Sequence, residues 1–253
     1  MKTLKNLKNF LFWLLLAVMV YSCSEEPVTP VADEMNIPLQ AQSLDDQAYL
    51  MGGQLIEFDD SEVFFEFNTT DNDLGLQIFL DGEDWERIRV MDPHRVKIVE
   101  VKAQGGLRDL GITELFFESA EPSPQEVLDL FDPGEYHFQG VTTEGDRLFG
   151  TGELSHEFLA PPVFSPRDFE EVDPRKVVVK WEVDDAEFVE VIIENEETDE
   201  TFDVIVSGEV SSLTIPPQFL DYGMEYKLEI LAIAENGNKT IAESFFVTKA
   251  RAS

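Results

Sequence analysis

Cysteine and histidine are scarce in this sequence of 253 residues, which contains one cysteine and three histidines. A single thiol cannot form an internal disulfide or supply the cysteine pairs of structural zinc sites. The histidines, His94, His137 and His156, lie too far apart for zinc-site spacings. The glycine-rich phosphate loop and the Gly-x-Ser-x-Gly elbow are also missing, so metal enzymes, nucleotide enzymes, α/β-hydrolases and thiol enzymes are disfavoured.

Positive charge is also in short supply. The chain has 18 Lys and Arg against 52 Asp and Glu, a net charge of -34. A surface this acidic repels phosphate backbones, so we expect no nucleic-acid partner. Hydrophobic residues nevertheless make up 43% of the chain, which is enough for globular cores in one large domain or two ordinary ones.

The apolar run over residues 10–21 is shorter than the roughly 20 residues that a permanent membrane-spanning helix needs. It follows Lys2, Lys5 and Lys8, the charged residues that precede Cys23. A basic segment followed by a short apolar segment predicts a secretory signal peptide over residues 1–22.

Cys23 stands directly after this run, in the segment Val20-Tyr21-Ser22-Cys23. The segment resembles the lipobox of bacterial lipoproteins, in which the cysteine is acylated and becomes the new N-terminus. The resemblance implies a palmitate-type lipid anchor on Cys23. Together with Ser24, it implies a protein of the cell outer membrane, either periplasmic or surface-exposed. The competing interpretation is an ordinary secreted protein with a buried free thiol.

Prolines divide the remaining chain. Several prolines among small and acidic residues predict a flexible, lipidated tether over residues 23–44. A proline pair at 161–162 marks a second boundary, because proline does not fit a central strand. We therefore expect a β-rich domain of unknown function over residues 45–160 and a second domain over residues 161–253.

The first domain is expected to be mostly antiparallel β-structure. Apolar residues alternate at Val63, Phe65 and Phe67, as in a half-buried strand. The dipeptides at 81–82 and 105–106, Asp-Gly and Gly-Gly, predict turns between strands.

One short helix is expected in this domain, over residues 124–131. Ser123 and Glu126 form a capping box and Pro124 suits the first helical position. In residues 75–83 and 111–124 the domain resembles a segment that recurs in secreted bacterial proteins of unknown activity. That resemblance implies no chemistry.

In the second domain, short predicted strands follow one another at the spacing typical of a β-sandwich. Strands are expected over residues 176–183, 188–194, 202–206, 212–215, 226–234 and 239–248. Trp181 and the segment from Leu220 to Tyr226 resemble the core tryptophan and the Leu-x-Pro-x-Thr-x-Tyr corner of fibronectin type III domains, with Tyr222 and Met224 in place of the usual Pro and Thr. The resemblance implies a spacer or binding module without catalytic residues.

The segment 71–75 is a weak candidate for a metal site. Asp71 and Asp73 place carboxylates at alternate positions before Gly75, as at the start of a calcium loop. The loop lacks a third ligand and the glutamate that should follow, so a polar turn is the favoured interpretation. Any calcium binding there is expected to be weak, and no other cofactor is expected.

Glu114, Phe116 and Glu118 form the second candidate site. Carboxylates among aromatic side chains can acquire raised pKa values suited to acid catalysis. The competing interpretation is a half-buried strand whose glutamates face water while Leu115 and Phe117 face the core. Strand alternation would expose Phe116. Such an aromatic beside a carboxylate suits a glycan- or protein-binding patch, whereas a second core beneath the predicted helix would hide it.

The sequence thus predicts a mainly β protein that is lipid-anchored in the cell envelope and acts as an extracytoplasmic binding or display module. We expect it to contact the membrane through its lipid and an extracellular protein or glycan through its domains, without catalysis. One alternative is a carboxylate-based hydrolase or an accessory domain of glycan processing. Another is a structural spacer.

Overall fold

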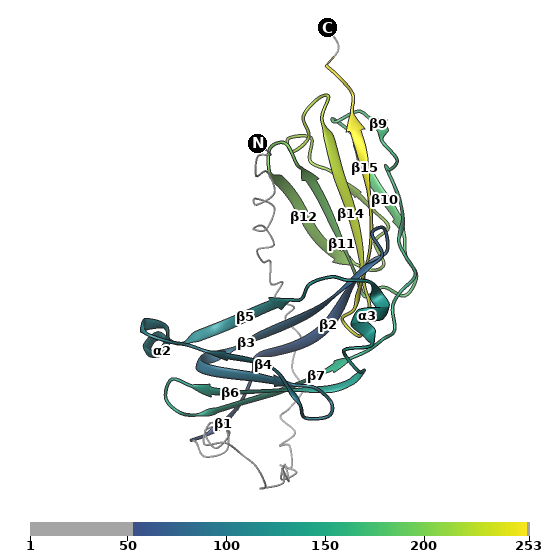
Figure 1. Ribbon diagram of the computed structural model, residues 1–253. Coiled ribbons are helices and arrows are strands. Elements are labelled where there is room, and N and C mark those ends of the chain that lie inside the picture. Colours follow the sequence, from purple (N-terminus) through teal and green to yellow (C-terminus); the bar gives the residue numbers. More distant parts are fainter. Residues whose placement is uncertain (1–52, 252–253) are drawn as a thin grey trace, which may run out of the picture. The chain divides into compact units, whose positions relative to one another are not determined.

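The computed structural model describes residues 53–251 (Figure 1). The predicted signal peptide, the tether and Cys23 lie outside these residues. The first half of the described chain contains β1 (Leu55–Glu57), β2 (Asp60–Asn68), β3 (Asp73–Met91), β4 (Lys97–Lys102), α2 (Gly106–Leu110), β5 (Ile112–Glu118), α3 (Pro124–Leu128), β6 (Gly134–Thr142) and β7 (Arg147–Leu154). The second half contains β8 (Val163–Ser165), β9 (Glu170–Val172), β10 (Val178–Glu182), β11 (Phe188–Asn195), β12 (Glu200–Ser207), β13 (Ser212–Thr214), β14 (Glu225–Ile233) and β15 (Lys239–Thr248). The predicted mainly β fold is confirmed.

β3 is the organising strand of the first half. Its first part pairs with β2 and β5, and its second part pairs with β4 and β6. The predicted turn at Asp81-Gly82 is wrong, because both residues lie inside this strand. The pairing of β3 with β5 shifts register between Asp81 and Trp85, and a Cβ on Gly82 would lie 3.1 Å from the Phe58 ring. The glycine therefore lets the strand bend closely over the core instead of reversing.

Two short helices accompany these strands. α3 starts at Pro124 with the predicted capping box between Ser123 and Glu126, and it ends at Leu128, before the expected end. α2 was not expected. Gly105, with φ of 56°, precedes it in place of the predicted turn, and the helix buries none of its residues. With five residues, α2 is too short for an apolar periodicity, the usual sequence signal for a helix, to be recognised.

The second half is a β-sandwich with a fibronectin type III-like fold. One sheet has the order β13-β10-β8, and the facing strands have the order β12-β11-β14-β15. The six expected strands are all present. Trp181 is buried in the core, and the Tyr226 hydroxyl accepts a hydrogen bond from the Asp221 backbone N–H at 2.7 Å. This bond is the tyrosine corner that the sequence predicted.

The two halves have separate hydrophobic cores but share one sheet. The main cluster of apolar residues before 160 is separate from the main cluster after 160, and Ile192, Leu231 and Ile241 form a small third cluster. The boundary at residues 161–162 stays a prediction, since β15 continues the sheet of the first half by pairing in parallel with β2. The paired residues are Lys239 with Glu66, Thr240 with Phe67 and Ile241 with Asn68.

The side chain of Asn238 secures this junction. It is 1% exposed, and its Oδ1 accepts the backbone N–H of Phe65 at 2.8 Å. Its amide nitrogen donates to the carbonyl oxygens of Ser155 and Glu157 at 2.8 and 2.9 Å. One amide therefore joins the β14–β15 turn to β2 and to the chain that leaves β7.

We predict that Asn238→Ala lowers the free energy of unfolding by about 2–4 kcal/mol, because it leaves the buried Phe65 N–H and the Ser155 carbonyl group without their partner, while the Glu157 carbonyl group keeps the Asn236 amide. Urea denaturation measures the change. Asn236→Ala, in the same turn, removes two less buried hydrogen bonds and should cost less than half as much. An equal loss of unfolding free energy in the two variants would contradict this prediction, because the hydrogen bond to β2 would then add nothing beyond the bonds of the turn.

Candidate functional site

The predicted residues Glu114, Phe116 and Glu118 lie on one face of β5, and all three are exposed. Leu115 packs against the first core as expected. Phe117 does not, since it is 38% exposed. β5 has β3 as its neighbour on one side and no described strand on the other, so its inward residues receive less cover than those of a central strand.

Strand register extends this face across three strands. Glu118 lies opposite Gln77 of β3, which lies opposite Phe64 of β2. Because side chains alternate along each strand, residues two apart share the face. We define the acidic face as this set of residues: Glu62, Phe64, Glu66, Gln77, Phe79, Asp81, Glu114, Phe116 and Glu118.

Two lysines of the second half neutralise part of the negative charge near this face. Lys239 Nζ lies 3.3 Å from Glu190 and 3.7 Å from Glu66. Lys227 Nζ lies 2.7 Å from Glu229 and 2.8 Å from Glu243. Each lysine is therefore shared between two carboxylates, and the surroundings stay negative.

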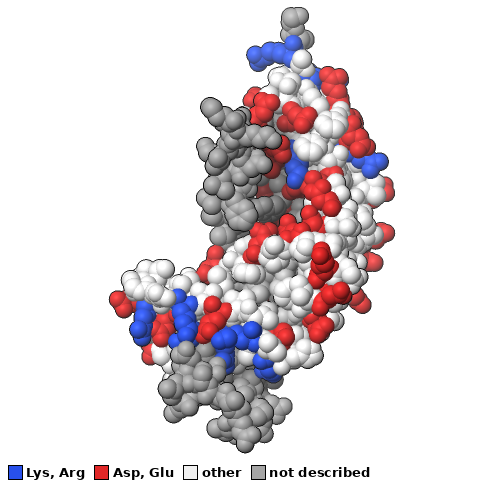
Figure 2. Space-filling model, in the orientation of Figure 1, with Lys and Arg blue, Asp and Glu red and all other residues white. Residues whose placement is uncertain are grey.

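Burial raises the pKa of Glu66 to about 7, an effect that Lys239 opposes and Glu118 and Glu121 reinforce. For Lys239, burial would lower the pKa, but Glu190 and Glu66 raise it above its usual value. Figure 2 shows the surplus of carboxylates on the face in view, whereas Lys and Arg gather near α2 and β4. That region contains six of them between residues 87 and 108.

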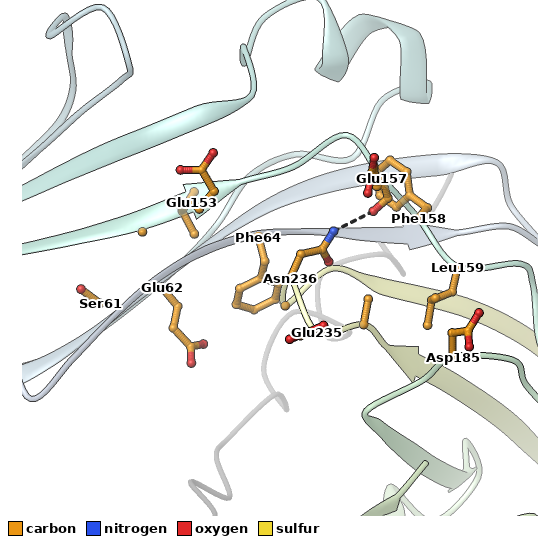
Figure 3. A pocket seen from close by; sticks show the side chains of 14 residues that line it. Ser61, Glu62, Phe64, Glu153, Glu157, Phe158, Leu159, Asp185, Glu235 and Asn236 are labelled. Atoms are coloured by element: carbon orange, nitrogen blue, oxygen red, sulfur yellow. Dashed lines mark hydrogen bonds between the residues drawn. The ribbon is translucent and has the colours of Figure 1, made fainter. Parts of the chain in front are cut away.

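A groove of about 700 Å³ lies beside β2 at the junction of the two halves (Figure 3). It is lined by Ser61, Glu62, Val63, Phe64, Gly152, Glu153, Glu157, Phe158, Leu159, Asp185, Ala234, Glu235, Asn236 and Gly237. Five of these residues are carboxylates, and none of the described lining residues is Lys, Arg or His. Apolar surface comes from Val63, Phe64, Phe158 and Leu159. The groove thus combines apolar walls with an acidic surround.

The groove borders an open strand edge. The whole of β2 pairs with β3 on one side. On the other side, β15 is the one described strand that pairs with β2, and it does so at residues 66–68. The Phe65 N–H points to this second side, where Asn238 accepts it. Backbone groups alternate in direction along a strand, so those of Ser61 and Val63 also point to this side, where no described strand pairs with them. β7 lies close by, since the Ser61 hydroxyl donates to the Thr151 carbonyl oxygen at 3.1 Å.

Sequence reasoning missed the groove and the Glu66 environment. The alternation of Val63, Phe65 and Phe67 implied that Glu62, Phe64 and Glu66 share the opposite face. It carried no information on which strands lie beside them. Pairing with β15, more than 170 positions later in the chain, is what brings Lys239 to Glu66.

The weak calcium candidate lies at the turn between β2 and β3. Asp71 is exposed, and Asn68 Oδ1 accepts the N–H groups of Thr70 and Asp71 at 2.9 and 3.3 Å. Asp73 is the first residue of β3. The segment has the form of a polar turn, and calcium binding there stays a prediction.

The histidines do not converge among the described residues. His94 contacts Asp132 at 2.9 Å, His137 contacts Glu135 at 3.3 Å, and His156 contacts the Phe131 carbonyl oxygen at 2.8 Å. Neither helix in residues 53–251 has the length and apolar character that crossing a membrane requires.

Comparison with known proteins gives structural likenesses of low similarity. No protein-family model matches the chain, and no curated protein matches it significantly. The chicken CNTN1 FN1–FN3 domains match with a TM-score of 0.36 and 12% identity, over 78% of this chain and 65% of that one. A two-domain fibronectin type III segment of chicken tenascin matches with a TM-score of 0.30 and 15% identity, over 76% and 99%.

A bacterial ice-binding adhesin matches with a TM-score of 0.27 and 9% identity, over 80% of this chain and 67% of that one. These scores define no common overall architecture. The description of the second half as fibronectin type III-like therefore rests on its own strand order and tyrosine corner.

We predict that Glu66 makes the fold less stable as pH rises. Its folded pKa of about 7 lies above its ordinary value of 4.5, so the folded state holds a proton that the unfolded state has already released. This stabilisation is complete below about pH 4.5 and is lost as pH rises through 7, by roughly 3 kcal/mol.

Urea denaturation in EDTA at about pH 5 and pH 8 tests this. Glu66→Gln should lose less stability between the two pH values than the parent protein, because it has no proton to release there. Glu114→Gln, on an exposed position of β5, should behave like the parent. An unchanged pH dependence in Glu66→Gln would contradict the raised pKa.

Proposed function

We propose that the chain is a lipid-anchored cell-envelope protein that binds extended, positively charged polypeptide segments in the groove beside β2. The observation that carries this proposal is the open edge of β2, which borders a groove with five carboxylates. Cys23 is the proposed lipid attachment site. The proposed location is the outer membrane, facing the periplasm or the surroundings of the cell.

The strand edge favours a polypeptide ligand. An exposed edge offers backbone N–H and C=O groups to a further strand, and peptide-binding domains use such edges for main-chain hydrogen bonds. Ser61 and Val63 supply these groups here. A glycan would make less use of them, although Phe116 on the acidic face offers a surface on which a sugar can stack.

Charge complementarity favours a basic ligand. Glu62, Glu153 and Glu235 lie around the groove without a lining cation among the described residues. Burial and Asp60 raise the pKa of Glu62, which Lys239 opposes, so an added positive charge would relieve repulsion. The protein's own residues 23–52 contain no Lys or Arg, so charge does not favour the tether as the occupant.

Binding accounts for this geometry better than the alternative functions. Glu114 and Glu118, the carboxylates that a hydrolase would use, do not line the groove. A pure spacer would have no use for an acidic groove beside an open edge. Nucleic acid remains disfavoured as a partner because the groove has the same sign of charge as a phosphate backbone.

A defined peptide pair tests the groove. We predict that the mature chain carrying Cys23→Ser binds an extended peptide of alternating Lys and Thr and does not bind the matched Glu and Thr peptide. Glu62→Lys combined with Glu235→Lys should weaken binding by about tenfold, through lost attraction and new repulsion. Fluorescence anisotropy measures the affinity.

Glu194→Lys with Glu197→Lys is the matched control, because it changes the net charge equally outside the groove lining. Peptide N-methylated at alternate residues should bind more weakly, since it cannot form a full set of main-chain bonds. Equal weakening by both lysine pairs, or indifference to N-methylation, would refute a groove that recognises a strand.

Membrane attachment has a separate test. Cys23→Ser should release the full-length protein from the membrane fraction, because it removes the site for the acyl chains that hold a lipoprotein in the bilayer. Carbonate washing and immunoblotting measure this. Ser22→Ala keeps a small residue before the cysteine and should stay attached. Retention of Cys23→Ser after washing would refute the anchor.

A further inference from the structure

A second face of the first half carries positive charge, in contrast to the acidic face. Arg87, Arg89 and Met91 of β3 lie opposite residues of β4 on one side and of β6 on the other, and these rows continue through β7. Because side chains alternate along each strand, residues two apart share the face. We define the cationic face as this set of residues: Leu55, Glu57, Arg87, Arg89, Met91, Lys97, Glu100, Lys102, His137, Gln139, Val141, Arg147, Phe149 and Thr151.

The cationic face departs from the charge of the chain, which is -34 in total. It has five Lys and Arg against two Glu, a surplus of three positive charges when His137 is neutral. Ion pairs within the face leave this surplus unchanged. The next row, where Glu135 lies opposite Glu153, is acidic, so the positive region ends where β3 ends.

The positive charge is most accessible along β4. Lys97 and Lys102 are exposed, whereas Arg87 and Arg147 are half-buried and Arg89 is buried. The two lysines of β4 are therefore the charges that a partner meets first.

Neighbouring groups respond to this positive charge. Lys97 Nζ donates to Glu100 Oε2 at 2.7 Å and holds the pKa of Glu100 below its usual value, and Lys102 acts in the same direction. Burial lowers the pKa of His137, and Arg95 lowers it further. Arg95, in the turn between β3 and β4, thus adds positive charge beside the face.

The cationic face points away from the acidic face. Phe65, which alternates with acidic-face residues, packs into the same core as Ile88 and Val90, which alternate with cationic-face residues. Figure 1 shows β2 and β5 in one layer and β4, β6 and β7 in the other. Packed sheets lie about 10 Å apart, which exceeds the Debye length of about 8 Å at physiological salt. The charges of the acidic face are thus largely screened from a partner on the cationic side.

The turn between β3 and β4 adds an exposed apolar side chain. Val96 is 58% exposed and lies between Arg95 and Lys97. The turn is ordered by Asp92, whose Oδ1 accepts the Val96 N–H at 2.7 Å and whose carbonyl oxygen accepts the Arg95 N–H at 2.9 Å. An exposed apolar residue flanked by cations is suited to the headgroup region of an anionic membrane.

We propose that the cationic face lies against the anionic headgroups of the membrane that holds the protein. This inference rests on the proposed attachment through Cys23. The face spans five strands and contributes no residue to the groove, so it suits a broad anionic surface better than a small anion. The 29 residues between Cys23 and residue 53 are ample to connect the bilayer with this face. Docking in this way leaves the acidic face turned away from the membrane, where a basic ligand can approach it.

Vesicles that carry the chemically attached protein test this orientation. The mature chain is coupled through Cys23, its one thiol, to maleimide-bearing lipid. This coupling takes the place of acylation, so the result does not depend on whether Cys23 is lipidated in the cell. Val96→Trp supplies a fluorescent reporter, because Trp85 and Trp181 are buried.

We expect the emission of the new indole to shift to shorter wavelength in vesicles of phosphatidylcholine with about 30% phosphatidylglycerol, but not in phosphatidylcholine alone. Brominated lipid should quench it in the anionic vesicles. About 0.5 M NaCl should reverse the shift, because salt screens the attraction between the lysines and the headgroups.

Lys97→Glu combined with Lys102→Glu reverses the accessible charge of the face and should abolish the difference between the two kinds of vesicle. Lys176→Glu with Lys180→Glu is the matched control, since both residues are exposed in the second half and the net charge changes equally. Circular dichroism verifies that each variant is folded. Three results would each overturn the proposal: the same emission in both kinds of vesicle, equal loss of the shift in both glutamate pairs, or a shift with soluble polyphosphate but none with anionic vesicles.

Discussion

The structure depends on a pairing of three residues, between Lys239–Ile241 of β15 and Glu66–Asn68 of β2. A strand has two edges, and β3 takes one edge of β2 throughout. Because β15 takes the second edge only briefly before it enters the sandwich, the part of β2 before Glu66 keeps an edge free. Asn238 fixes the point where the two strands come together. The groove, the approach of Lys239 to Glu66 and the shared sheet all follow from this arrangement.

The acidity of the chain has a definite distribution. Carboxylates collect on the outward face of the sheet and around the groove, and the lysines among them are shared. Bringing like charges together without full compensation lowers stability, so such an arrangement is more easily explained by ligands than by folding. A basic peptide would supply the positive charge that this surface lacks.

Local patterns predicted the local structure. The strands and the capping box at Ser123 each involve residues close in sequence, so their spacing indicated them. The corner at Tyr226 was implied by the resemblance to fibronectin type III domains. The turn expected at Asp81-Gly82 was wrong because packing against Phe58 made the glycine part of a bend within β3. The convergence of Glu66, Glu118 and Glu121 could not be found from the sequence. Glu118 was singled out, but Glu66 joins it through the registers of β2 with β3 and of β3 with β5, which no local spacing encodes.

The open edge of β2 has a consequence for copies of the protein that lie close together. Unpaired edges tend to add strands from identical neighbours, and crowding on a surface favours such self-association. Here two edges approaching each other would bring Glu62 and the other groove carboxylates of one copy against the same residues of the next. Their mutual repulsion opposes homotypic sheet extension. The carboxylates around the groove would thus keep crowded copies of the protein monomeric, and the edge of each copy would stay free for a partner of opposite charge.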